Sequence, residues 1–243
     1  ILLEMGLVTL VEAAEGRDLY QYDRKEFSLI ELVAEMFGVS PDQLHLLHTH
    51  SSEKYREFKS GEEHLTEFHR TYYSHVNPRT KDDKPLPPTT LGRKFLDVYE
   101  RFVRELVGVA FTEKTYFQRV PGFRIQMPGN FALAMVEKDK WKNHSPYELN
   151  GFVPFTPVKP NNTIWAETKE DKDDFQPLIA VPGQFMIWDG ANLQHKNLMN
   201  DTGVSRVSID FRLLPASKYQ PSDLTSYVTK TPMTIGSDGY WIH

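Results

Sequence analysis

The sequence predicts a mainly β protein with a helical N-terminal half, built as a β-sandwich or small barrel supported by helices. Residues 27–37 and 91–106 carry apolar side chains at helical spacing. From about Tyr116 the pattern changes to short apolar segments separated by Pro, Gly, Asn and Asp. The chain has 243 residues, of which 40% are hydrophobic, and this is enough to form the core of one large domain.

The first 112 residues are expected to form a mostly helical support region. In the segment 27–37, Gly38 stands where it can end a helix. In the segment 91–106, apolar residues fall on one stripe and charged residues lie mostly on the opposite side. The proline-rich stretch 85–88 between these segments has the composition of a loop.

The second half is expected to contain seven strands, each bounded by turn residues. They are 123–127, 131–137, 148–155, 163–167, 184–188, 193–197 and 204–213. Many short strands after a helical run favour a barrel or sandwich, with helices covering its outer sheet. We therefore expect a single domain over residues 1–243, with its β core at 113–215 and a C-terminal extension at 216–243.

Composition excludes several classes of function. The chain has no cysteine, which rules out disulfides, thiolate metal sites, iron–sulfur clusters and cysteine nucleophiles. Its net charge of −5, without a basic block, argues against nucleic acid as a partner. No stretch approaches the roughly 20 apolar residues of a membrane span, so we expect a cytoplasmic protein with no membrane partner.

The strand expected at 204–213 has an unusual polar face. Alternation along a strand separates Val207, Ile209, Phe211 and Leu213 from Arg206, Ser208, Asp210 and Arg212. Inside a cavity, a guanidinium and a hydroxyl can hold a carboxylate by paired hydrogen bonds. A solvated edge strand with an Asp–Arg pair is the alternative, and the strand alone does not decide between them.

His195 adds a metal ligand to this pattern. It precedes Arg206 across the turn at 200–203, so two antiparallel neighbours can direct both side chains into one barrel mouth. Asp139 lies upstream, at the end of the expected strand 131–137. A carboxylate, a distal His and an R-x-S sequence are typical of non-haem iron(II) oxygenases that use 2-oxoglutarate as co-substrate.

Five segments carry a family resemblance by their joint order and spacing: 118–130, 144–150, 162–167, 189–195 and 200–212. Over residues 116–215 the chain resembles the 2-oxoglutarate/iron(II) oxygenases of the streptomycin-biosynthesis type, which share the core of the phytanoyl-CoA-dioxygenase-like enzymes. The resemblance implies a double-stranded β-helix (jelly roll, cupin-like). It further implies an iron- and oxygen-dependent hydroxylation, desaturation or cyclisation of a small polar metabolite in specialised-metabolite or antibiotic biosynthesis.

The resemblance also implies the site residues. Asp139 and His195 would ligate Fe(II), and Arg206 with Ser208 would hold the far carboxylate of 2-oxoglutarate. The chain differs from the family at the first metal position, where Glu137 stands in place of a histidine. Glutamate can ligate iron through oxygen, although carboxylates favour ferric over ferrous iron.

Three explanations of the glutamate remain open. Glu137 ligates the metal directly, as a third catalytic residue beside the other two ligands. Alternatively, His144 or a histidine of the N-terminal half supplies the missing nitrogen. In the third explanation the site is inactive and serves as a binding module.

Other residues are candidates for secondary roles. Asn150 can place its amide near the co-substrate or act as a structural cross-strand amide, and Arg124 and Gln126 can line the cavity floor as further co-substrate contacts. Weaker candidates for substrate contact, each with a structural role as the alternative, are His144, Trp165, Glu167 and Arg212. For Arg212 the structural role expected is an ion pair with Asp210. Two other functions stay open: a non-catalytic cupin-like protein that binds an anion, and a metal-dependent isomerase or epimerase on the same barrel.

Overall fold

The computed structural model describes residues 6–51, 53, 66–130, 136–142, 144–226 and 229–243. Its strands are β1 (Val8–Ala14), β2 (Arg17–Tyr22), β3 (Thr115–Gln118), β4 (Gly122–Gln126), β5 (Leu149–Pro154), β6 (Ile164–Ala166), β7 (Gln176–Pro177), β8 (Gln184–Trp188), β9 (His195–Asn197), β10 (Arg206–Pro215) and β11 (Trp241–Ile242). Its α-helices are α1 (Leu29–Phe37), α2 (Glu67–Val76) and α3 (Thr90–Ala110). None of the helices described is long and apolar enough to cross a membrane.

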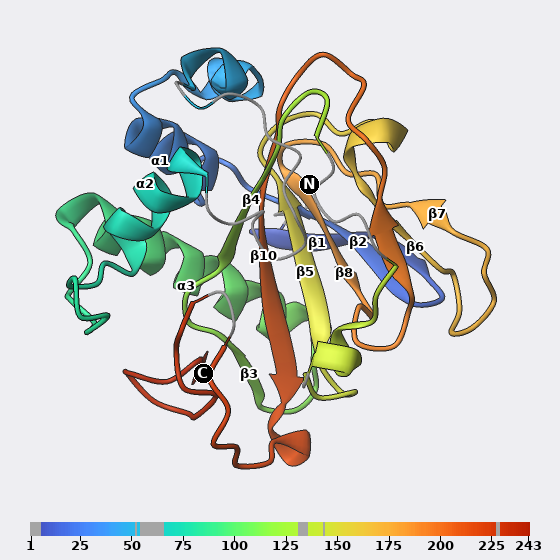
Figure 1. The fold of residues 1–243 in the computed structure, drawn as a ribbon. Helices are drawn as coiled ribbons and strands as arrows, with labels where there is room; N and C mark the ends of the chain where they lie inside the picture. Colours follow the sequence, from blue (N-terminus) through green and yellow to red (C-terminus); the bar gives the residue numbers. More distant parts are fainter. Residues whose placement is uncertain (1–5, 52, 54–65, 131–135, 143, 227–228) are drawn as a thin grey trace, which may run out of the picture.

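The strands form two antiparallel sheets. The larger sheet has the order β1-β2-β8-β5-β10-β3-β11, with β4 also paired to β10, and the smaller one has the order β7-β6-β9. In Figure 1 the long strand β10 runs through the centre of the molecule beside β5. The mainly β, double-stranded β-helix fold expected from the sequence is confirmed.

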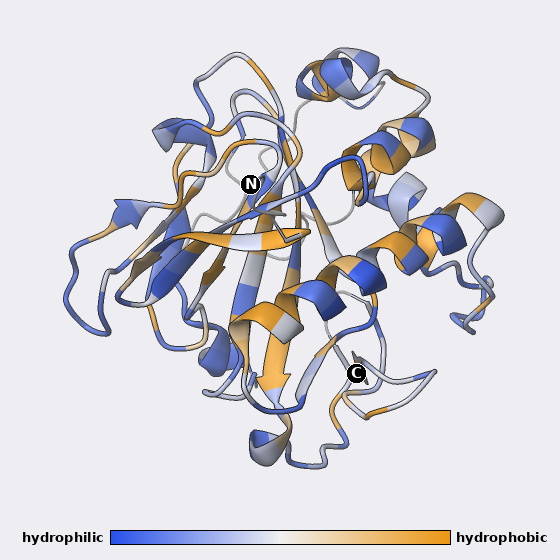
Figure 2. Cartoon of the chain, turned by 180° about the vertical axis from the view of Figure 1, so that it is seen from behind, coloured by the Kyte–Doolittle hydropathy of each residue, from blue (hydrophilic) through white to orange (hydrophobic). Residues whose placement is uncertain are grey.

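The helices cover the back of the larger sheet. Seen from behind, α3 crosses the sheet with its charged residues outward (Figure 2). Thr89 caps this helix by accepting the backbone N–H of Gly92, and its buried stripe includes Phe102. The ring of Phe102 packs edge-on against Phe185 of β8 and Phe211 of β10, so the helical face and the sheet share one aromatic core.

The N-terminal region differs from the expected helical one in its first elements. Residues 8–22 form the hairpin β1–β2, and β2 pairs with β8, from Arg17 opposite Trp188 to Gln21 opposite Gln184. Tyr20 and Tyr22 are buried against the core, which anchors the hairpin to the larger sheet. The helical part of this region is confirmed from α1 onward, and α1 ends at Gly38 with φ of 67°.

Most expected strands are present, with ends that shift by one or two residues. The segment 184–188 coincides with β8, whereas residues 131–135 of the expected strand 131–137 lie outside the described residues. The C-terminal extension contributes β11, which pairs with β3. Four strands (β1, β2, β3 and β11) therefore extend the larger sheet beyond the strands that the pattern of the second half predicts.

The two faces of β10 are separated as the sequence predicts. Val207, Ile209, Phe211 and Leu213 are fully buried in the core that the helices share. The other face carries Arg206, Ser208, Asp210 and Arg212, and all four make polar contacts on the side of the sheet away from the helices.

Candidate metal centre

Backbone pairing brings Glu137 and His195 together. The backbone N–H of Glu137 donates to the carbonyl of His195 (3.0 Å), and the N–H of His195 donates back to the carbonyl of Glu137 (2.9 Å). Such a doubly bonded antiparallel pair directs both side chains to the same side. Asp139 follows at the start of a short 3₁₀ turn (Asp139–Lys142), where its N–H donates to the carbonyl of Gly190 (3.1 Å).

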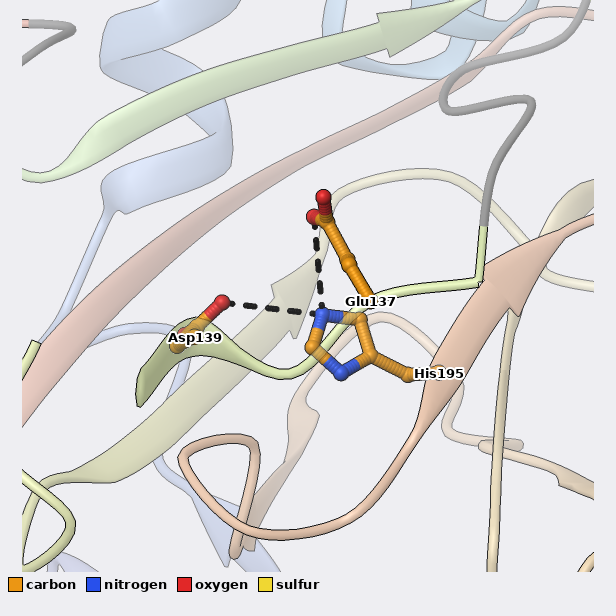
Figure 3. Close-up of side chains that lie close together, drawn as sticks. All are labelled: Glu137, Asp139 and His195. Atoms are coloured by element: carbon orange, nitrogen blue, oxygen red, sulfur yellow. Dashed lines mark ion pairs between the residues drawn. The ribbon is translucent and has the colours of Figure 1, made fainter. Parts of the chain in front are cut away.

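Three potential ligand atoms converge at this point (Figure 3). Nε2 of His195 lies 3.7 Å from Oε1 of Glu137 and 3.6 Å from Oδ1 of Asp139. All three ligand atoms lie within 4.8 Å of one another, which is close enough for one metal ion. Nδ1 of His195 lies 3.0 Å from the carbonyl of Leu193, which can only accept, so Nδ1 donates there and Nε2 is the ring nitrogen that faces the carboxylates.

Both carboxylates are held in the ionised form. Burial raises the pKa of Asp139, but the charge of Arg212, together with neighbouring histidines and the hydrogen bond from Asn150, brings the pKa well below its ordinary value. Burial also raises the pKa of Glu137, and its contacts with His195 and Lys142 bring it below its ordinary value. At neutral pH the centre thus presents two anionic oxygen ligands and one imidazole nitrogen, a donor set that suits a divalent transition metal.

Arg206 lies on the same face of β10 as Arg212, the partner of Asp139. Arg206 is 2% exposed, and its guanidinium donates to Ser208 Oγ (2.8 Å) and to Asn197 Oδ1 (3.4 Å). Its Nε has no partner, and within the described part of the chain no carboxylate forms an ion pair with it. Burial, with the charge of Arg124 added, lowers the pKa of Arg206 to about 10, so it stays a buried cation at neutral pH. A buried cation without a counter-ion can bind an anion.

The structure assigns protein partners to the three residues expected near the co-substrate. Asn150 donates to Oδ2 of Asp139 (2.8 Å), so it orients a potential metal ligand. Arg124 pairs with Asp210 (2.7 Å), and charge from both Arg124 and Arg212 keeps the pKa of Asp210 below its ordinary value despite burial. Gln126, which is paired with Arg206 in the sheet register, donates its amide to the carbonyls of residues 130 and 198 and leaves its Oε1 without a partner.

The four weaker substrate candidates also have partners within the protein. His144 Nδ1 lies 2.7 Å from Glu148, and the trio of potential ligands contains Glu137 rather than His144. Trp165 donates to the carbonyl of residue 160 (2.6 Å). Glu167, 1% exposed, accepts backbone N–H groups from residues 173 and 194 (2.8 Å each) and so organises a loop. Arg212 bonds Asp139 (2.7 Å) as well as the expected Asp210 (3.1 Å).

Two residues that act on the potential metal ligands are not indicated by the sequence pattern. Lys142 Nζ bonds Oε2 of Glu137, although its place in a charged segment gives no sign of this contact. Gly190 reads as a turn residue, but a Cβ there would lie 2.2 Å from Nδ2 of Asn150 and 2.9 Å from the ring of Trp188. The glycine therefore lets Asn150 reach Asp139, while the ring of Trp188 packs edge-on against His195 (centroids 5.0 Å apart).

Comparison with known proteins identifies a relative of nearly equal length. The chain is 33% identical over 221 residues to the streptomycin biosynthesis protein StrG of Streptomyces griseus, covering 91% of this chain and 95% of that protein. No family model matches the chain.

Solved structures show more distant similarity. AviO1 from Streptomyces viridochromogenes has a TM-score of 0.48 and 13% identity, covering 85% of this chain and 93% of that one. The non-haem α-ketoglutarate-dependent carbocyclase SnoK from nogalamycin biosynthesis has a TM-score of 0.45 and 10% identity, covering 83% and 80%. Similarity at this level carries no argument about the reaction or the substrate.

Proposed function

The chain belongs to the family of the streptomycin biosynthesis protein StrG, and on this premise we propose that it is an Fe(II)- and 2-oxoglutarate-dependent oxygenase of antibiotic or related specialised-metabolite biosynthesis. Its substrate would be a small polar metabolite, oxidised by hydroxylation, desaturation or cyclisation. The motifs at 118–130, 189–195 and 200–212, which resemble those of such oxygenases, support this proposal.

One observation carries the proposal. The polar face of β10 carries Arg212, which bonds one of the three potential metal ligands, and Arg206, a buried guanidinium with no counter-ion among the described residues. The donor set of one imidazole and two carboxylates fits Fe(II) or Mn(II). The unpartnered Nε of Arg206 and the hydroxyl of Ser208 fit a carboxylate group.

The proposed roles follow from these contacts. Glu137, Asp139 and His195 would hold the metal, and Arg206 with Ser208 would orient 2-oxoglutarate by its far carboxylate. When bound, iron and 2-oxoglutarate would supply oxygen activation coupled to the loss of carbon dioxide from the co-substrate. The residues themselves contribute position and charge, since ligand atoms held by buried hydrogen bonds need no reorganisation when the metal binds.

We also propose that residues 1–243 act as a single oxygenase domain. Support comes from a core cluster that joins the helices to the sheet: Leu32 of α1, Phe102 of α3 and Ile209 of β10 are members of one buried group. The helical region would act as the rigid backing of the strand that carries the site.

An anaerobic titration followed by an oxygen pulse tests the proposed reaction. The protein is loaded with Fe(II), then with 2-oxoglutarate, and succinate is quantified after oxygen is admitted. We expect one Fe(II) per chain and succinate that depends on both iron and oxygen, even if turnover without the native substrate is slow. Metal uptake without succinate would favour an isomerase or epimerase, and absence of metal uptake would favour a non-catalytic anion-binding protein.

A further inference from the structure

In each carboxylate of the centre the two oxygens have different kinds of partner, and the arrangement is the same in both. In Asp139, Oδ1 faces Nε2 of His195, while Oδ2 accepts hydrogen bonds from Arg212 (2.7 Å) and Asn150 (2.8 Å). In Glu137, Oε1 faces the same nitrogen, while Oε2 is bonded by Nζ of Lys142. Each carboxylate therefore has one oxygen committed to a cation and one oxygen directed at the metal position.

The charges explain why a second cation is needed. Two carboxylates and a neutral imidazole carry a charge of −2, which a divalent metal cancels, and 2-oxoglutarate then adds two further negative charges. Arg212 and Lys142 bring two positive charges into direct contact with the ligands, so each ligand carboxylate keeps a cation of its own when the co-substrate adds its negative charge. With histidine in place of Glu137, one negative charge would be absent and the ammonium would have no such role.

We propose that Lys142 sets the charge of the metal centre: it bonds Oε2 of Glu137, leaves Oε1 for the metal, and supplies a positive charge that offsets the glutamate at this position. This inference rests on the proposed function, because it presupposes that Glu137 binds the metal. The same cation repels the metal and attracts the dianionic co-substrate, so its two effects on binding have opposite signs.

Lys142 also lends itself to substitution. Its side chain is 57% exposed, whereas that of Arg212 is 10% exposed and bonds Asp210 as well as Asp139. Loss of Arg212 would disturb a buried network, but loss of an exposed ammonium leaves the fold intact. Lys140 provides a matched control, since it lies on the same turn and pairs with Glu170 rather than with a metal ligand.

The test measures two affinities rather than turnover. Mn(II) is titrated into the metal-free protein by calorimetry, and 2-oxoglutarate is then titrated into the Mn(II)-loaded protein. For Lys142→Met we expect Mn(II) to bind about three- to tenfold more tightly and 2-oxoglutarate about three- to tenfold more weakly. Lys142→Arg should retain wild-type values for both, and Lys140→Met should change neither.

The outcomes separate this inference from the proposed function. If the wild-type protein binds neither Mn(II) nor 2-oxoglutarate, the proposed function fails. If the wild type binds both, but Lys142→Met leaves both affinities unchanged or weakens both together, the inference alone is overturned. Thermal unfolding of the metal-free variants confirms that each is folded before its affinities are compared.

Discussion

Substitution of Arg206 by methionine should affect the affinity for 2-oxoglutarate and the free energy of unfolding in different ways. In the protein without co-substrate, this guanidinium is buried, lacks an ion pair within the described residues, and has an unpartnered Nε. Such a group costs free energy in the folded state, and an apolar side chain of similar volume removes that cost. We therefore expect Arg206→Met to leave the free energy of unfolding unchanged or to raise it.

The same change should weaken 2-oxoglutarate binding strongly. Removing one partner of a buried, hydrogen-bonded charge pair costs about 2–5 kcal/mol. Since each 1.4 kcal/mol is tenfold, the dissociation constant should rise by about 30- to 4000-fold. Calorimetric titration of the Mn(II)-loaded protein measures this, and urea denaturation measures the stability in parallel.

A matched arginine controls for the loss of charge. Arg124 is paired with Asp210, so Arg124→Met leaves a buried carboxylate with one cation fewer and should destabilise the protein. The reasoning is refuted if Arg206→Met destabilises the fold by several kcal/mol and leaves the affinity for 2-oxoglutarate unchanged. In that case Arg206 would be a structural residue rather than an anion site.

Three further variants test the surrounding network. Asp210→Asn leaves two guanidinium groups short of a partner and should cost about 3–5 kcal/mol in urea denaturation. Because the folded-state pKa of Asp210 is depressed, its stabilisation is present above pH about 4 and is lost as the pH falls, so the variant should show a weaker pH dependence of stability. Gly190→Ala should push Asn150 off Asp139, lower stability by about 1–3 kcal/mol and weaken Mn(II) binding; unchanged metal affinity would contradict the role of that amide. Glu137→His should retain metal binding and shift preference from Mn(II) towards Co(II) and Ni(II) in competition titrations, and a collapse of metal binding would show that the glutamate has another role.

The β core was predictable because its signal is local. The strand β8 coincides with the segment expected from apolar residues between turns, and the alternation along β10 separates its buried face from its polar face as predicted. The hairpin β1–β2 was missed because Leu10 and Val11 are exposed while the turn around Gly16 is rich in charge, so its period-2 pattern is weak. The hairpin is joined to the sheet by pairing with β8, a segment distant in sequence, and a local pattern does not show this pairing.

The potential metal ligands of the candidate site could be predicted from the sequence, whereas the side chains that hold them in place could not. Asp139 and His195 follow from residue type and order, and the structure brings Glu137 to them. The bond from Arg212 to Asp139 joins residues far apart in sequence, so no local pattern indicates it. The ion pair of Arg212 with Asp210 on the same strand was expected, and it is the other of the two ion pairs that Arg212 forms among the described residues. The need for glycine at position 190 arises from the side chain of another strand, which no local pattern can encode.

A crystal structure of the protein grown with Mn(II) and 2-oxoglutarate tests the metal-centre assignment most directly. We expect one anomalous peak bonded by Oε1 of Glu137, Oδ1 of Asp139 and Nε2 of His195, with the far carboxylate of 2-oxoglutarate on the guanidinium of Arg206. A metal ligated by His144 in place of Glu137, or a co-substrate that leaves Arg206 without a carboxylate, would contradict the account.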